Sequence, residues 1–176
     1  MVKSKFSNQG ITLIGVLIAI SILSLTIVGL GRSLVARKDV VGAGREKLIA
    51  ASIAREGLEL ARALRDDNWL SQNDWTTQLC DNASFTIDAA TVRNKNDLGS
   101  SDDAELFIAD DGGEWLHDQN AGPSSGYNRL INIDCAEKDN DPAFITVTSK
   151  VTWTSRGHDN NVEIKEKLFN WITEKP

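Results

Sequence analysis

The chain has 176 residues, of which 41% are hydrophobic and 25% are charged. This composition suits one globular domain with an additional apolar segment. The formal net charge is −6 at pH 7, and the acidic excess lies in the C-terminal part. The chain therefore lacks the broad basic surface of a nucleic-acid-binding protein, and only a small local patch for DNA is left open.

The N-terminal part contains a long run without any charge, from Ile11 to Gly31. An α-helix of about 20 apolar residues crosses the roughly 30 Å of a bilayer core. We therefore predict a transmembrane helix over residues 11–31, and Lys3 and Lys5 before it favour a cytoplasmic N-terminus. The apolar region of a conventional signal peptide is shorter, so conventional cleavage at the far end of the run, near Arg32, is disfavoured but remains open.

A short basic and polar leader, residues 1–10, comes directly before the apolar run. The stretch Gly10-Ile11-Thr12-Leu13-Ile14 with its aliphatic continuation resembles the class III leader of type IV prepilins and type II secretion pseudopilins. The resemblance implies that prepilin peptidase cleaves between Gly10 and Ile11 and methylates the new N-terminal amine. It also implies that the apolar helix stays on the mature protein, first as a membrane anchor and then in the filament core.

The fifth residue of the implied mature chain is Gly15, where this family usually has a glutamate. In the family, that carboxylate pairs with the N-terminal amine of a neighbouring subunit during assembly. Without it, the chain resembles minor subunits, notably the tip subunit of type II secretion pseudopili. An unpaired carboxylate in lipid is costly, and a tip subunit has no amine above it. We therefore expect a place at the filament tip or in initiation.

Residues 32–66 continue the helical composition, without proline and with many Ala, Leu, Arg and Glu residues. From Ile49 to Leu64, apolar residues at spacings of three, four and seven form one stripe, with charged residues opposite. We predict that this amphipathic half packs on a globular head of residues 67–176. Residues 32–47 carry charges all around the axis, which indicates a solvated or subunit-facing neck.

The C-terminal part changes from helical to strand periodicity. Apolar residues alternate with threonine and lysine over residues 145–154, a turn follows at 156–160, and a second strand continues over 162–171. Residues 131–135 predict a third strand, and residues 85–87 and 106–108 are weaker candidates. The expected fold class is α+β, and this order of elements resembles the type IV pilin fold, with a long N-terminal helix packed on a C-terminal antiparallel sheet.

Cys80 and Cys135 lie beyond the apolar run, in the part that an exported protein exposes to an oxidising compartment. A disulfide between them would contribute about 4 kcal/mol in the chain-entropy model. Pairing cannot be read from sequence, so a disulfide and two buried thiols both remain open.

No pattern in the chain matches a catalytic or metal-binding motif, so we expect no enzyme and no cofactor. His117 and His158 stand in polar segments without metal-ligand spacing, and we expect both at the surface. The acidic stretches 110–114 and 139–141 could hold calcium, although neither matches the twelve-residue calcium loop. Calcium is therefore the alternative to a chain without metal.

The leader and the residues after it predict a minor type IV pilin-like subunit of a surface filament. Its implied partners are other pilin subunits through helix bundling, prepilin peptidase, and an inner-membrane assembly platform with its ATPase. It would span the inner membrane once, with its N-terminus in the cytoplasm, before assembly, and would afterwards lie in a cell-surface filament or a periplasmic pseudopilus.

Two alternatives remain for the function. The first is a type II secretion pseudopilin, which shares the fold and the processing. The second is a membrane-anchored adhesin or DNA-uptake module, in which Trp69, Trp75, Trp115 and Tyr127 form an exposed binding face. A surface hydrolase has no motif in its favour.

Overall fold

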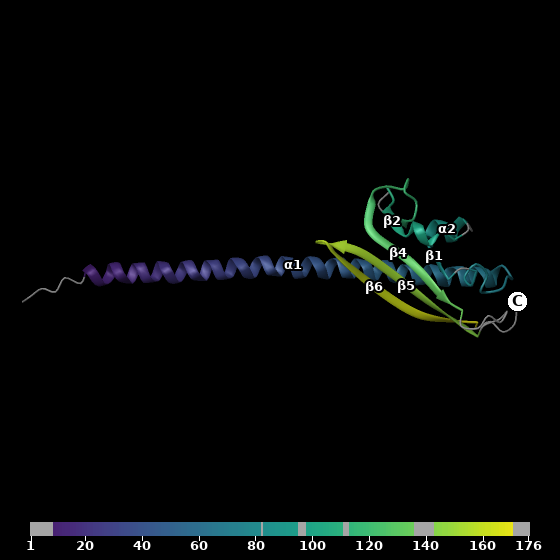
Figure 1. Cartoon of the computed structure of the whole chain (residues 1–176), viewed down its shortest axis with the longest axis horizontal. Helices are drawn as coiled ribbons and strands as arrows, with labels where there is room; N and C mark the ends of the chain where they lie inside the picture. Colours follow the sequence, from purple (N-terminus) through teal and green to yellow (C-terminus); the bar gives the residue numbers. More distant parts are fainter. Residues whose placement is uncertain (1–8, 82, 95–97, 111–112, 136–142, 171–176) are drawn as a thin grey trace, which may run out of the picture. The chain divides into compact units, whose positions relative to one another are not determined.

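The computed structural model of the chain describes residues 9–81, 83–94, 98–110, 113–135 and 143–170, with the backbone alone for 9–12, 29–39 and 94. The chain divides into two compact units, Met1–Arg45 and Glu46–Pro176. Helix α1 (Gln9–Leu70) contributes residues to both units (Figure 1).

The first unit contains the N-terminal part of α1, whose described side chains over residues 13–28 are all exposed. No helix in the described part of the chain is both long and apolar enough to cross a membrane. Residues 13–28 rise only ~24 Å at about 1.5 Å per residue, which is less than the roughly 30 Å of a bilayer core. The predicted fold class, a type IV pilin fold with a transmembrane helix half at residues 11–31, is therefore wrong.

The second unit is built on a six-stranded antiparallel sheet with the order β3-β2-β4-β5-β6, in which β1 also pairs with β4. The strands are β1 (Ser84–Phe85), β2 (Glu105–Ile108), β3 (Trp115–Leu116), β4 (Ser124–Asp134), β5 (Phe144–Ser155) and β6 (His158–Phe169). A short helix α2 (Ala89–Asn94) and a 3-10 turn η1 (Ser101–Asp103) lie between β1 and β2 in the chain.

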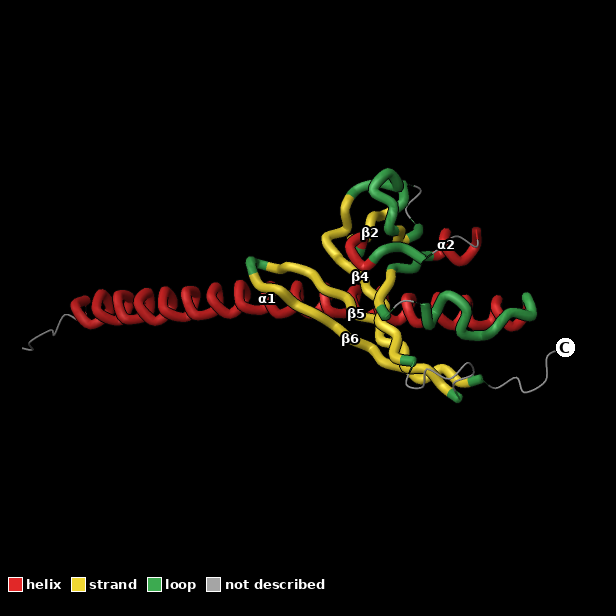
Figure 2. Tube along the Cα trace, turned by 45° about the vertical axis from the view of Figure 1, so that its right-hand side comes forward, coloured by secondary structure: helices red, strands yellow, loops and turns green. Residues whose placement is uncertain are grey.

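The C-terminal part of α1 packs on the inner face of β4, β5 and β6 (Figures 1 and 2). Strand β5 explains this arrangement, because its residues alternate between buried and more exposed positions along its whole length. The buried side chains of α1 include Ile53, Ala54, Leu58 and Ala61. They belong to the apolar stripe of residues 49–64, so helical and strand periodicity meet in one core.

Strands β5 and β6 form a long hairpin (Figure 2). The turn has two residues, Arg156 and Gly157, with φ angles of 54° and 77°. Two successive positive φ angles match the twist of paired strands, as in primed hairpin turns. The predicted turn at 156–160 is too long, because His158 already pairs with Ser155.

Candidate functional site

The apolar segment, residues 13–28 of α1, is the most unusual surface of the first unit. Its large side chains are exposed around the whole helix, with values of 66% at Leu13, 58% at Leu17 and 74% at Leu25. The hydroxyl groups of Ser21 and Ser24 donate to carbonyls one turn earlier in the same helix, at 2.8 Å each. Each hydroxyl therefore has its hydrogen-bond acceptor within the same helix and adds little polarity to the surface.

An apolar helix surface of this kind favours cover by other apolar groups. Each Å² of apolar surface left in water forgoes about 25 cal/mol of burial free energy. A helix that is apolar all around is normally surrounded on every side rather than on one face. The apolar segment is therefore a candidate assembly surface.

The three residues singled out for processing and assembly lie at the start of α1. Gly10 and Ile11 follow the first helical residue, Gln9, and their side-chain surroundings are outside the described part. Gly15 is in the apolar segment, and a Cβ there would have no heavy atom within 4 Å. Within the chain, a side chain would fit at this position, so the fold itself does not require glycine there.

Cys80 and Cys135 form a disulfide, with 6.1 Å between their Cα atoms. The bond joins the segment after α1 to the residue that follows β4. That segment carries Trp75 and Leu79 into the core, and the Nδ2 of Asn68 donates to the carbonyl of Trp75 at 3.4 Å. The disulfide therefore links this irregular segment, which supplies Trp75 and Leu79 to the core, to the end of β4.

The aromatic residues do not form the exposed face that an adhesin would need. Trp69 and Trp75 are buried and stack with ring centroids 6.3 Å apart. Tyr127 is also buried and meets the partly buried Trp115 edge to face at 6.1 Å. Burial of these aromatic rings stabilises the core. The predicted aromatic binding face is therefore wrong.

The acidic stretches give no metal centre in the part that the structure describes. No group of three or more His, Cys, Asp or Glu side chains gathers there. Glu114 pairs instead with Arg93 at 2.6 Å, while residues 111 and 139–141 lie outside the described residues. His158 is exposed in β6.

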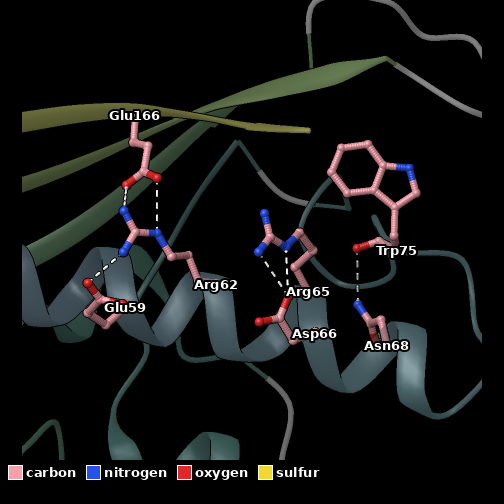
Figure 3. Close-up of polar contacts among 7 residues, drawn as sticks. All are labelled: Glu59, Arg62, Arg65, Asp66, Asn68, Trp75 and Glu166. Carbon is pink, nitrogen blue, oxygen red and sulfur yellow. Dashed lines mark hydrogen bonds and ion pairs between the residues drawn. The ribbon is translucent and has the colours of Figure 1, made fainter. Parts of the chain in front are cut away.

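Arg62 joins α1 to the edge strand β6 (Figure 3). Its Nε donates to Oε1 of Glu166 at 3.0 Å, its Nη2 donates to Oε2 of the same carboxylate, and its Nη1 reaches Oε1 of Glu59 at 2.6 Å. The hydrogen bonds to Glu166 and Glu59 raise the pKa of Arg62 above its usual value, against a smaller effect of burial. This bidentate contact with Glu166 holds β6 against α1.

Arg129 of β4 is the largest fully buried polar side chain, with 0% exposure. Its Nη1 lies 3.1 Å from Oε1 of Glu56 on α1, and its Nη2 donates to the carbonyl of Ile87 at 2.7 Å. Burial lowers the pKa of Arg129, and the nearby Glu56 and Asp88 carboxylates act in the opposite direction. The guanidinium therefore connects α1, β4 and the segment before α2.

Asp88 and His117 extend this cluster toward β2 and β3. The carboxylate of Asp88 accepts hydrogen bonds from the backbone N–H of His117 at 3.0 Å and from the N–H and hydroxyl of Thr91. Burial acts to raise the pKa of Asp88, but these hydrogen bonds outweigh it, and the pKa lies below the usual value. The Nδ1 of His117 lies 3.1 Å from the carbonyl of Glu105, and its Nε2 is buried. His117 was predicted at the surface, and the structure makes it partly buried.

Glu56, Asp88 and His117 lie around the buried guanidinium of Arg129, and these four residues are called here the buried polar cluster. The sequence predicted no role for them. A signal exists for one member, since Arg129 alternates with Tyr127 and Ile131, which are both inward-facing positions of β4. Its partners come from distant parts of the chain, and no local pattern marks them.

Comparisons of the chain with protein-family models, with curated proteins and with solved structures find no match.

Proposed function

We propose that the chain is a minor structural subunit of a type IV pilin-like surface filament, joined to its neighbours through the apolar segment of α1. The observation that carries the proposal is the exposure of every described side chain over residues 13–28. A filament core of packed helices covers such a helix on all sides, whereas packing on one face of a globular domain leaves most of it in water.

The leader supports the same proposal. The motif from Gly10 to Ile14 resembles a prepilin leader, so the proposed mature chain begins at a methylated Ile11 after cleavage by prepilin peptidase. An assembly platform with its ATPase then adds the subunit to a cell-surface filament or a periplasmic pseudopilus. Gly15, in place of the usual glutamate, supports a position at the tip or in initiation.

The head adds support of a different kind. It contains the Cys80–Cys135 disulfide. Disulfides persist in oxidising compartments, so this bond suits a subunit that is exported from the cytoplasm. Its tryptophans at 69 and 75 stabilise this core rather than a binding face. These features favour a structural subunit over a tethered adhesin.

The mass of the N-terminal peptide of the mature protein tests the processing. We expect a peptide that starts with N-methylated Ile11 in the wild type. Gly10→Val should leave the leader uncleaved, because a branched side chain replaces the glycine that the leader motif requires. Gly15→Ala is the matched control and should be processed normally, since the added Cβ meets nothing within 4 Å. A mature chain that starts at Met1 or near Arg32 contradicts the proposal.

The position in the filament needs a separate measurement. Immunogold labelling of an epitope fused after Pro176 should mark filament ends. Label along the whole shaft contradicts the tip position and leaves the assembly proposal standing.

A further inference from the structure

The β2–β3 lobe, residues 101–110 and 113–123, is held to the rest of the second unit by the core packing of Leu106 and Trp115, by pairing of β2 with β4 and by polar contacts. Strand β2 pairs with β4 through an irregular register between Glu105 and Phe107. The backbone N–H of Arg129 donates to the carbonyl of Ala104 at 2.7 Å. On the other side of the lobe, the N–H of His117 donates to Asp88 at 3.0 Å. His117 therefore takes part in one of the polar contacts that hold the lobe in place.

The tautomer of His117 follows from its neighbours. A carbonyl only accepts hydrogen bonds, so the Nδ1 that lies 3.1 Å from the carbonyl of Glu105 carries the proton. The lone pair of the neutral ring is then on Nε2. That atom is buried and has no hydrogen-bond partner among the described residues. Protonation would place a new N–H and a positive charge at this buried position.

The charged and polar groups around His117 come from β4, α1, η1, β2 and the residue before α2. Arg129 of β4 repels a second positive charge, while Asp88, before α2, attracts it. Glu56 of α1 is engaged with Arg129 at 3.1 Å. The backbone carbonyls of Asp103 in η1 and Glu105 in β2 favour the charged ring, and the Glu105 carboxylate accepts from the hydroxyl of Ser124.

We propose that His117 is the trigger of an acid-sensitive latch, which holds the β2–β3 lobe closed while its ring is neutral and releases it when Nε2 is protonated. On release the lobe leaves Asp88 and Arg129, Leu106 leaves the core, and the ring gains water as a partner for its second N–H. The released form is a minor state that protonation makes more frequent. The hairpin of β5 and β6 and its contact with α1 do not involve His117 and stay in place.

The direction of the pH effect follows from the two forms. Burial first, and Arg129 second, hold the pKa of His117 below its usual value in the closed form, against the opposite effect of the Glu105 carbonyl, Asp88 and the Asp103 carbonyl. The open form has a pKa near the ordinary value of about 6.5 and binds the proton more tightly. The closed lobe is therefore fully stable above that pH and loses stability as the pH falls through the lower pKa of the closed form. Asp88 stays ionised in this window, because its pKa is lowered.

Hydrogen exchange of the full-length chain in detergent tests the latch. The amide of Arg129 donates to the carbonyl of Ala104 at 2.7 Å, and the amide of His117 donates to the carboxylate of Asp88 at 3.0 Å. Both hydrogen bonds cross the boundary of the lobe and break when it is released. After correction for intrinsic rates, their opening constants should rise at least about threefold from pH 7 to pH 5. Amides of Val147 and Val151 in β5 should not respond.

Two variants separate the latch from a general acid effect. His117→Asn keeps a donor for the Glu105 carbonyl but cannot take up a proton, so its lobe should show no such rise. His158→Asn changes the exposed histidine and should respond as the wild type does. The latch is wrong if the wild-type lobe does not respond or if His117→Asn keeps the response. Should His117→Asn not fold, NMR titration of the wild-type ring decides, and a pKa at or above about 6.5 overturns the latch.

Discussion

The Oγ of Ser149 on β5 lies 2.7 Å from the position that a Cβ would occupy on Gly57 of α1. Two more side-chain atoms crowd the same point, Cδ1 of Ile131 at 2.9 Å and Cδ of Arg129 at 3.0 Å. Glycine therefore lets the helix approach the sheet closely at the place where the buried Arg129 crosses between them.

The first prediction concerns this contact. Gly57→Ala should destabilise the second unit by roughly 1–3 kcal/mol, because the methyl group forces the surrounding core side chains to shift. The higher helix propensity of alanine, about 1 kcal/mol, opposes the effect without cancelling it. Urea unfolding followed by tryptophan fluorescence measures the change.

Gly44→Ala is the matched control on the same helix. A Cβ there meets no heavy atom within 4 Å, so only the gain of up to about 1 kcal/mol in helix propensity remains. Equal effects of the two substitutions would contradict the packing argument.

The second prediction concerns Arg62 and Glu166. A double-mutant cycle with alanine at both positions should give a coupling free energy of about 1 kcal/mol, at the upper end for partly exposed pairs, because Nε and Nη2 of the guanidinium donate to the two oxygens of one carboxylate. The Lys150–Glu163 pair, with 3.7 Å between Nζ and Oε1 on the outer face, serves for comparison and should couple by less than about 0.5 kcal/mol. A weaker coupling for Arg62 than for Lys150 would argue against this anchor.

Glu166 also bears on aggregation. Strand β6 is an edge of the sheet, and an inward-pointing charged residue is one way in which proteins keep edge strands from pairing with other chains. Glu166 lies opposite the buried Val147, so it has this orientation.

The third prediction concerns the disulfide. The bonded residues are separated by 55 positions, and removal of the bond by Cys80→Ser with Cys135→Ser should cost about 4 kcal/mol in the chain-entropy model. Reductant should lower the unfolding midpoint of the wild type and leave that of the double variant unchanged. Equal midpoints of wild type and variant without reductant would contradict the prediction.

The fourth prediction concerns the buried charge of Arg129. Glu56→Gln removes the carboxylate at 3.1 Å and should cost roughly 1–3 kcal/mol, less than the roughly 3–5 kcal/mol for a broken pair that is fully buried, because Glu56 is partly exposed. Glu59→Gln, on the exposed side of α1, should change stability by less than about 0.5 kcal/mol. A similar loss in both variants would mean that the buried guanidinium does not need this partner.

The alternation of apolar and polar residues predicted the β5–β6 hairpin, because each residue of a half-buried strand faces either the core or the solvent. Val147, Val151 and Trp153 are buried, and the threonines between them are more exposed, as a half-buried strand requires. The turn was predicted too long because Asp159 and Asn160 are typical turn residues. They nevertheless pair across the hairpin, since Arg156 and Gly157 alone reverse the chain.

The buried polar cluster and the length of the helical apolar surface could not be predicted in the same way. Arg129 is buried because Glu56, Ile87 and Asp88, which lie far away in sequence, supply acceptors and charge. The sequence run from Ile11 to Gly31 indicated a membrane span by length alone. In the described part the apolar segment covers residues 13–28, and no helix there meets the requirement.

The most direct test of the central claim is photo-crosslinking from the apolar segment in cells that assemble the filament. A benzophenone side chain at Leu17 should form crosslinks to other filament subunits, because neighbouring helices cover this position in the proposed assembly. The same group at Asn161, on the outer face of β6, provides the background. Crosslinks from Leu17 that are no more frequent than this background, or that contain no filament subunit, would contradict the claim.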